Sequence, residues 1–224
     1  LERLEQAGLE EDTIVIFNSD HGGVLPRSKR WLYNSGTHAP LIVRIPEKYK
    51  HLWPAAAPGS TVDRLVSFID FPKTWLSLAG AEVPERMQGR VFLGPAADPE
   101  PAFVYGFRDR MDERFDSQRS VRSKEFVYIQ SAMPNVPWGQ TLEYLWKMPA
   151  TQAWEKAHRA GLTNAVTGRF FGPKPVEELY DTRTDPDNVV DLAGRPEHAA
   201  RVASMRAELR RWQLEVRDSG LLPE

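Results

Sequence analysis

The chain has 224 residues, and 41% of them are apolar, which is enough for a substantial globular core and is not a disordered composition. Basic and acidic residues nearly balance, 29 against 31, so nothing in the charge supports a nucleic-acid or membrane-surface partner. No apolar run is long enough to be a membrane span. The lack of cysteine excludes disulfides, thiolate metal sites and a cysteine nucleophile within this sequence.

The first elements indicate part of an α/β sheet. Residues 1–8 have helical spacing and end on a glycine, and a chain that begins inside a helix without methionine indicates a fragment of a longer protein. TIVIF, residues 13–17, is an apolar and β-branched run, typical of a strand that is covered on both faces. PLIVRI, residues 40–45, predicts a second strand.

About twenty residues separate these two strands, which is far longer than most connections in compact domains. Loops of this length are often functional, and this one contains His21, Lys29 and His38. It is the first concentration of chemically useful side chains in the chain.

The later elements alternate between helices and short strands. We expect a helix within residues 62–78, with Asp70 as its N-cap and Gly80 after its end. A strand is predicted at 102–107, a hairpin-like pair at 120–121 and 126–130, a helical region at 141–161, and a strand and turn from 178. Residues 197–217 form the longest predicted helix, whose single apolar stripe faces the core: Val202, Met205, Leu209, Trp212 and Val216.

NSDHGG, residues 18–23, places an acid and an imidazole at the end of the first strand. Ligands of α/β sheets bind at the carboxyl ends of strands, and the two glycines allow the chain to turn so that Asp20 and His21 converge. The alternative is a polar turn with a capping aspartate. Lys29 lies nine residues further on, and its ammonium suits a sulfate or phosphate oxyanion held between it and a cation.

These segments, taken together, resemble the sulfatase family of the alkaline-phosphatase superfamily. The resemblance rests on TIVIFNSDHG, Lys29, LYNSGTHAPLIVRIP, the helix-like VSFIDFPKTWLSLAGAEVP and the later ELYDTRTDPDNVVDLA, and it covers most of the chain. RSVRSKEFVYI and LRRWQLEVRDSG look closest to the N-sulfoglucosamine sulfohydrolase (sulfamidase-like) branch. The resemblance to the sulfatase family implies an α/β fold. Residues 1–100 would form part of an alkaline-phosphatase-like sheet sandwiched by helices, and residues 101–224 would form a smaller C-terminal α+β subdomain.

The resemblance also implies roles for single residues. Asp20 would be a carboxylate ligand of a divalent cation, Ca²⁺ in most sulfatases, and His21 would take the neighbouring ligand position or contact the nucleophile or the sulfate. Lys29 would bind sulfate oxygens and neutralise charge on the leaving group, and His38 would line the substrate side. For His38, a loop histidine that bonds only to backbone is an equally good interpretation.

The run RDRMDERFD, residues 108–116, has two interpretations. Arg108, Asp109 and Arg110 would recognise a sulfated, acidic sugar, arginine through sulfate or carboxylate and aspartate through hydroxyls. The alternative is a solvated loop with internal ion pairs that each contribute little.

Several parts of the family pattern are missing. The family nucleophile is a formylglycine made from Cys or Ser in a C/S-x-P/A-x-R motif, and no such motif occurs here. The paired acids that supply further metal ligands are absent as well. We therefore expect this chain to be the C-terminal half of a sulfatase, whose partners are a sulfated small molecule or sugar and the N-terminal half of the same protein. The resemblance suits a periplasmic, secreted or lysosomal-type compartment, which the sequence does not fix.

Two other functions fit the same residues. One is a phosphodiesterase, phosphonate hydrolase or phosphoethanolamine transferase of the same superfamily, which also places SDHG after a strand. The other is a non-catalytic interaction module that keeps the fold. The residue at the nucleophile position upstream separates them: Cys or Ser for a sulfatase, Thr for phosphoryl transfer, and none for the module.

Overall fold

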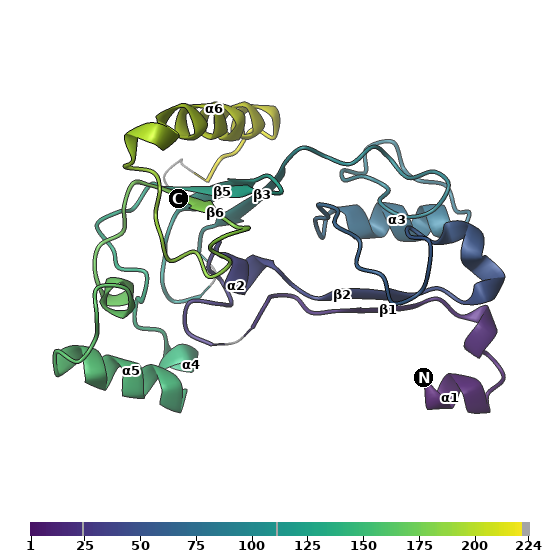
Figure 1. The fold of residues 1–224 in the computed structure, drawn as a ribbon, viewed down its shortest axis with the longest axis horizontal. Helices are drawn as coiled ribbons and strands as arrows, with labels where there is room; N and C mark the ends of the chain where they lie inside the picture. Colours follow the sequence, from purple (N-terminus) through teal and green to yellow (C-terminus); the bar gives the residue numbers. More distant parts are fainter. Residues whose placement is uncertain (24, 111, 221–224) are drawn as a thin grey trace. The chain divides into compact units, whose positions relative to one another are not determined.

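The computed structural model describes residues 1–23, 25–110 and 112–220, so Met111 of the charged run and the last four residues of the predicted 101–224 domain lie outside the described residues. The chain divides into two compact units, one formed by Leu1–Ser19 with Pro40–Val104 and the other by Asp20–Ala39 with Tyr105–Glu224. Figure 1 shows their helices and strands. The long loop of the sequence therefore belongs to the same unit as the C-terminal half of the chain.

The first unit is built around a two-stranded sheet. Helix α1 (Glu2–Gln6) and the 3-10 turn η1 (Glu10–Asp12) lead into β1 (Val15–Asn18), which pairs antiparallel with β2 (Leu41–Arg44) before η2 (Glu47–Leu52). Phe17 is 58% exposed and Ile42 is 62% exposed. TIVIF is typical of a strand that is covered on both faces in a complete sheet, and the part of the sheet described here leaves apolar side chains of β1 and β2 in solvent.

Helix α3 (Asp70–Leu78) confirms the helix predicted before Gly80, which follows it with a φ of +66°. The predicted cap is displaced by one residue, because Ile69 is the N-cap and Asp70 begins the helix. The buried Asp70 carboxylate accepts the backbone N–H groups of Ser67 at 2.9 Å and Arg90 at 2.8 Å. It therefore holds the chain before the helix to the segment after it.

The second unit contains a four-stranded sheet in the order β3-β4-β5-β6. Its strands are β3 (Val104–Arg108), β4 (Gln118–Arg122), β5 (Phe126–Ser131) and β6 (Glu177–Asp181). β5 pairs antiparallel with both β4 and β6. The predicted hairpin is thus β4 and β5, and β6 joins it from 46 residues further along the chain, because strand pairing is decided by tertiary packing.

Helix α6 (Ala199–Glu215) follows the turn η4 (Pro196–His198) and packs on β4 and β5 (Figure 1). Its predicted stripe is buried at Val202, Met205 and Leu209. The stripe then continues at the buried Gln213 and not at Val216, because a step of four from Leu209 keeps the same face. Trp212 instead stacks on Tyr105 with ring centroids 4.7 Å apart.

The opposite face of the sheet is covered by residues of the long loop. Trp31, Leu32 and Tyr33 are buried there beside Val127 and Ile129, which alternate with the α6-facing side chains of β5. The same core includes side chains from α4 (Glu143–Trp146) and from the turn η3 (Thr167–Phe171), and α5 (Pro149–Arg159) contributes the half-buried Trp154. The loop is thus anchored by burial of three large apolar side chains.

Backbone contacts bring the two ends of this loop together. The Gly22 N–H donates to the Gly36 carbonyl at 3.0 Å, and the Lys29 N–H donates to the Gly23 carbonyl at 2.9 Å. A Cβ at Gly22 would lie 2.3 Å from the Ser35 carbonyl oxygen, and a Cβ at Gly36 would lie 2.2 Å from two carbonyl oxygens. Only glycine fits at either position, where α2 (Asn34–Thr37) approaches the NSDHGG segment.

A buried polar cluster ties the same loop to β6. The Tyr33 hydroxyl donates to Glu178 Oε2 at 2.8 Å, and the Tyr180 hydroxyl donates to the same oxygen at 2.5 Å. Burial raises the pKa of Glu178 above its ordinary value. Nearby, the Asn34 N–H donates to the Asn188 side chain at 2.7 Å.

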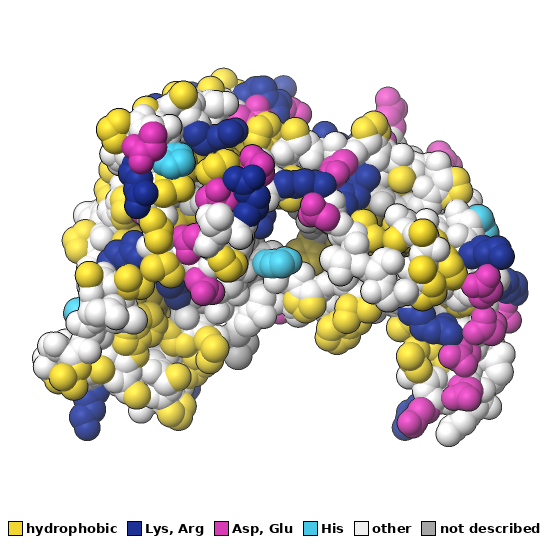
Figure 2. All heavy atoms as spheres, viewed as in Figure 1, with side chains coloured by type: hydrophobic (Ala, Val, Ile, Leu, Met, Phe, Trp, Pro, Cys, Tyr) yellow, Lys and Arg dark blue, Asp and Glu magenta, His cyan; other side chains and the backbone are white. Residues whose placement is uncertain are grey.

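Charged side chains of both signs are interspersed on the drawn face of the molecule, as Figure 2 shows, in keeping with the net charge of −2. Across the described ranges, no helix combines the length and apolar character needed to cross a bilayer.

We expect Gly36→Ala to destabilise the protein by about 1–3 kcal/mol, because its Cβ would overlap two backbone carbonyl oxygens that cannot move independently. Chemical denaturation measures this loss. Gly194→Ala is the matched control, because nothing lies within 4 Å of a Cβ built there and no left-handed φ is involved. Equal stability of the two variants would contradict the close packing of the loop.

A second prediction concerns Asp218, which accepts from Arg119 Nε at 2.6 Å and Nη2 at 2.9 Å. The Arg119 hydrogen bonds lower the pKa of Asp218 to about 2. A carboxyl group whose pKa is lower in the folded protein than in the unfolded chain stabilises the fold at every pH above the unfolded pKa of about 4. This stabilisation is lost as the pH falls through the folded pKa of about 2. At neutral pH the Arg119–Asp218 pair therefore contributes about 2 kcal/mol to the free energy of unfolding.

Asp218→Asn should therefore reduce the unfolding free energy at pH 7 and flatten its pH dependence between about pH 4.5 and 2. Chemical denaturation across that range measures both effects. Glu197→Gln, an exposed carboxylate beyond this cluster, should keep the wild-type slope. An unchanged slope in Asp218→Asn would contradict the assigned role.

Candidate functional site

The structure brings Asp20 and Lys29 into direct contact. Lys29 Nζ lies 2.9 Å from Asp20 Oδ2, and the two side chains are 38% and 75% exposed. The Lys29 hydrogen bond is the largest cause that lowers the pKa of Asp20, and the nearby His21 lowers it further. The pair therefore presents a carboxylate and an ammonium side by side, both accessible to solvent, directly after β1.

This pair is positioned by the loop packing described above. Asp20 and Lys29 are brought close because the Lys29 N–H bonds to Gly23 and because Gly22 bonds to Gly36. The burial of Trp31, two residues after Lys29, fixes the other end of the short segment. An anionic carboxylate and three ammonium donors, one of them used by Asp20, suit a cation and an oxyanion as neighbouring ligands.

The two histidines occupy different environments. His21 is half-buried beside Asp20, and His38 is exposed at the end of α2, where its backbone N–H donates to the Asn34 carbonyl at 2.8 Å. The imidazole of His38 is thus accessible, as a substrate-lining residue requires. Its substrate role and the metal role of His21 stay predictions.

The available ligands do not complete a cation site. Ca²⁺ takes six to eight oxygen ligands, whereas Asp20 and His21 offer one carboxylate and one nitrogen. In the part of the chain that the structure describes, no group of three or more His, Asp or Glu side chains is placed to hold a metal. Asp20 fits a cation as one ligand of several, and the remaining ligands would have to come from outside this set.

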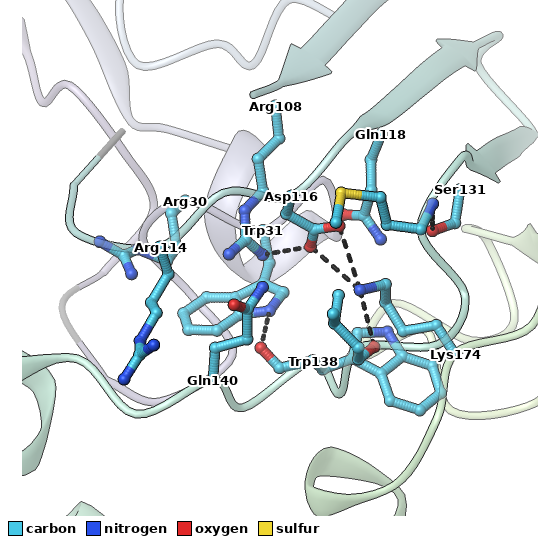
Figure 3. A network of polar contacts seen from close by, with 12 residues as sticks. Arg30, Trp31, Arg108, Arg114, Asp116, Gln118, Ser131, Trp138, Gln140 and Lys174 are labelled. Atoms are coloured by element: carbon cyan, nitrogen blue, oxygen red, sulfur yellow. Dashed lines mark hydrogen bonds and ion pairs between the residues drawn. The ribbon is translucent and has the colours of Figure 1, made fainter. Parts of the chain in front are cut away.

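The charged run at residues 108–116 is buried at its two ends, Arg108 and Asp116, and exposed at Arg110, Glu113 and Arg114. Arg108 is 2% exposed, and its Nη1 lies 3.2 Å from Asp116 Oδ2. Lys174 Nζ lies 3.1 Å from the same carboxylate and 2.9 Å from the Val136 carbonyl oxygen (Figure 3). An internal ion pair does exist, and it is buried together with a second cation.

Burial dominates the electrostatics of this cluster. It lowers the pKa of Arg108 and the pKa of Lys174, while the Asp116 carboxylate opposes both shifts. Two cations share one carboxylate that is 0% exposed. Such an arrangement costs desolvation and adds little net stability, so its value lies in fixing the geometry of the run.

The three predicted sugar-binding residues lie in three different environments. Arg108 forms an ion pair with Asp116, and Asp109 accepts hydrogen bonds from Nη1 and Nη2 of Arg119, each at 3.0 Å. Arg110 is exposed, with its guanidinium 5.7 Å from the Phe115 ring centroid. The role of each of the three in binding a substrate stays a prediction.

Sequence reasoning missed the residues that hold these candidates in place: Arg30, Asp112, Asp116, Arg119 and Lys174. Arg30 forms an ion pair with Asp112, so the residue after Lys29 contacts the charged run directly. The signal in the sequence was the alternation of positive and negative side chains within RDRMDERFD, which indicates ion pairs but not their partners. Lys174 lies 58 residues after Asp116, and no local pattern pairs them.

Two surface hollows of about 360 and 120 Å³ lie elsewhere in the second unit. The larger is lined by α6 and Gln130, and the smaller by aromatic side chains with Arg27 and Arg169. Neither of these two hollows is lined by any of the candidate residues.

Comparison with known proteins gives consistent matches. The Sulfatase family model matches residues 1–81. An ulvan-active sulfatase of Formosa agariphila is 37% identical over 100% of this chain, which corresponds to 37% of that relative. Human N-sulphoglucosamine sulphohydrolase is 29% identical over 97% of this chain and 45% of its own length. The chain thus spans less than half the length of these relatives.

Solved structures of the alkaline-phosphatase-like fold are similar as well. A 2-O GAG sulfatase superposes with a TM-score of 0.67 at 20% identity and covers 100% of this chain and 41% of its own. The phosphonate monoester hydrolase of Agrobacterium radiobacter gives a TM-score of 0.59 at 20% identity, over 98% of this chain and 38% of its own. These likenesses establish the predicted α/β fold. Residues 1–81 match the Sulfatase family model, and the whole chain is similar in sequence to sulfatases.

Proposed function

We propose that this chain is the C-terminal portion of an enzyme that hydrolyses sulfate esters or N-sulfate groups of sulfated sugars. The observation that carries the proposal is the Asp20–Lys29 pair, a carboxylate that suits a cation beside an ammonium that suits an oxyanion. The relatives support the substrate class, since they include an ulvan-active sulfatase and N-sulphoglucosamine sulphohydrolase.

Sulfatases as a family use a divalent cation and a formylglycine nucleophile, which together supply the attack on sulfur. In this proposal the cation is Ca²⁺, Asp20 is one of its ligands and His21 occupies the next position. The nucleophile and the remaining acids belong to the N-terminal half of the same protein. Lys29 binds sulfate oxygens through the ammonium donors that Asp20 leaves available and offsets the charge that develops on the leaving oxygen or nitrogen.

The sugar part of the substrate is recognised by the accessible side chains. Arg110 supplies a planar fork for a second sulfate or a carboxylate, and His38 lines the same substrate. Arg108 pairs with Asp116, and Asp109 pairs with Arg119. These two residues therefore contribute to substrate binding indirectly, because they fix the backbone conformation of the run. The alternative function of a phosphonate hydrolase is supported only by a similar fold at 20% sequence identity. A shared fold does not discriminate between sulfate and phosphonate substrates.

Lys29→Ala in the full-length enzyme should lower kcat/KM for a sulfated monosaccharide by about 10²–10³-fold, because one electrostatic contact to the reacting group is removed. Steady-state kinetics measures this loss. Lys156→Ala, an exposed lysine of α5, is the matched control and should leave kcat/KM unchanged. Wild-type turnover of a phosphonate monoester in preference to sulfate would favour the alternative enzyme class.

The isolated 224-residue chain should show no hydrolysis of an aryl sulfate. Its described residues offer at most two side-chain ligands for the cation, and its sequence has no formylglycine motif. Product release from p-nitrophenyl sulfate, with the full-length enzyme as positive control, measures this. Turnover by the isolated chain would contradict the division of the site between two halves.

A further inference from the structure

Arg30 combines three unfavourable features at one position. Its backbone has a left-handed φ of +79°, which costs of order 1 kcal/mol for a residue other than glycine. Its side chain is only 4% exposed, and its Nε and Nη1 have no hydrogen-bond partner among the described residues. Costs of this kind persist where the surrounding structure imposes them, and they concentrate at functional sites.

The Arg30 side chain contacts the charged run and two aromatic rings outside it. Its Nη2 forms an ion pair with the Asp112 carboxylate, which is 12% exposed. Its guanidinium lies 4.9 Å from the Tyr144 ring centroid and 5.7 Å from that of Trp31. A planar cation that pairs with a carboxylate and lies over aromatic rings makes contacts that lysine cannot reproduce.

The first and last residues of the run are fixed by a second ion pair. Arg108 forms an ion pair with Asp116, Lys174 donates a hydrogen bond to Asp116, and the Arg108 guanidinium lies 5.3 Å from the Trp31 ring centroid (Figure 3). Trp31 thus lies near both arginines, one from the loop and one from the run. In the sequence, the exposed Arg110 lies between Arg108, which pairs with Asp116, and Asp112, which pairs with Arg30.

Lys29 is held by contacts that do not involve Arg30. Its backbone bonds to Gly23, its ammonium bonds to Asp20, and the loop is anchored by the Gly22–Gly36 hydrogen bond. Loss of the Arg30–Asp112 pair would therefore release the middle of the run at Asp112 and leave Lys29 in place.

We propose that Arg30 is a positioning residue, which holds the charged run at Asp112 against the Lys29 loop and so determines how the enzyme binds the sugar part of its substrate. The inference rests on the proposed sulfatase function and deepens it. Because a buried ion pair is weak evidence for stability, the contribution of Arg30 is expected in substrate affinity. Sulfate chemistry on a substrate without a sugar should not depend on it.

The test compares Arg30→Gln, Asp112→Asn and the double variant in the full-length enzyme, on a sulfated oligosaccharide and on p-nitrophenyl sulfate. We expect KM for the oligosaccharide to rise about tenfold in each single variant, with kcat and the aryl sulfate kcat/KM within about twofold of wild type. The double variant should be no worse than the singles, because both partners of one interaction are removed. Arg183→Gln, whose exposed guanidinium pairs with Glu125 at 2.6 Å, is the control and should match wild type.

Two kinetic outcomes would overturn the proposal: equal losses on both substrates, or no change in KM for the oligosaccharide. Hydrogen exchange provides a readout that does not need activity. In Arg30→Gln, amide exchange within residues 108–116 should accelerate about tenfold while β5 and β6 keep wild-type protection. A wild-type enzyme inactive on both substrates would contradict the proposed function alone, and unchanged exchange in the run would contradict the positioning role.

Discussion

The candidate site depends on the burial of Trp31, Leu32 and Tyr33 against the four-stranded sheet. Each large apolar side chain contributes about 1.5–3 kcal/mol when it is fully removed from water. Together they offset the conformational entropy of ordering the short segment that carries Lys29. Without this anchor, Asp20 and Lys29 would be two charges on a long flexible loop, and a surface pair alone contributes at most about 1 kcal/mol. The apolar triplet therefore makes a defined electrostatic site possible.

Charge in this unit is divided between accessible and buried groups. Asp20, Lys29, His38 and Arg110 remain open to solvent, as ligand contacts require. Arg30, Arg108, Asp116 and Lys174 are buried and bond to one another or to their neighbours. The buried groups cost desolvation that an apolar core would avoid. The buried charged groups fix the backbone from which the accessible side chains project. The desolvation cost of burying them is thus accompanied by a defined geometry of the candidate site.

Periodic patterns predicted most of the regular structure. The β4–β5 hairpin and helix α6 carry strong local signals, because alternation and the 3.6-residue period follow directly from the side-chain directions of strands and helices. The burial of Arg108 had no such signal, since its partners are set by long-range packing. Asp70 was assigned to the cap and begins the helix instead, where its carboxylate bonds to Arg90, 20 residues away. Local reasoning therefore identified the chemistry of the loop and the run, and tertiary structure decided which charges stay accessible.

The exposed strand and the incomplete cation site have one explanation under the proposed function. Phe17 and Ile42 keep apolar side chains in solvent, and β1 leads within two residues to Asp20, which is one ligand of a site that needs several. Further chain of the same protein that covers β1 would bury apolar surface and deliver acidic ligands at the same point of the sequence. Because metal binding and folding are coupled whenever the ligands come from separate segments, cation affinity would then report on how completely the two halves associate. Hydrophobic burial and metal coordination would thus stabilise the same assembled state.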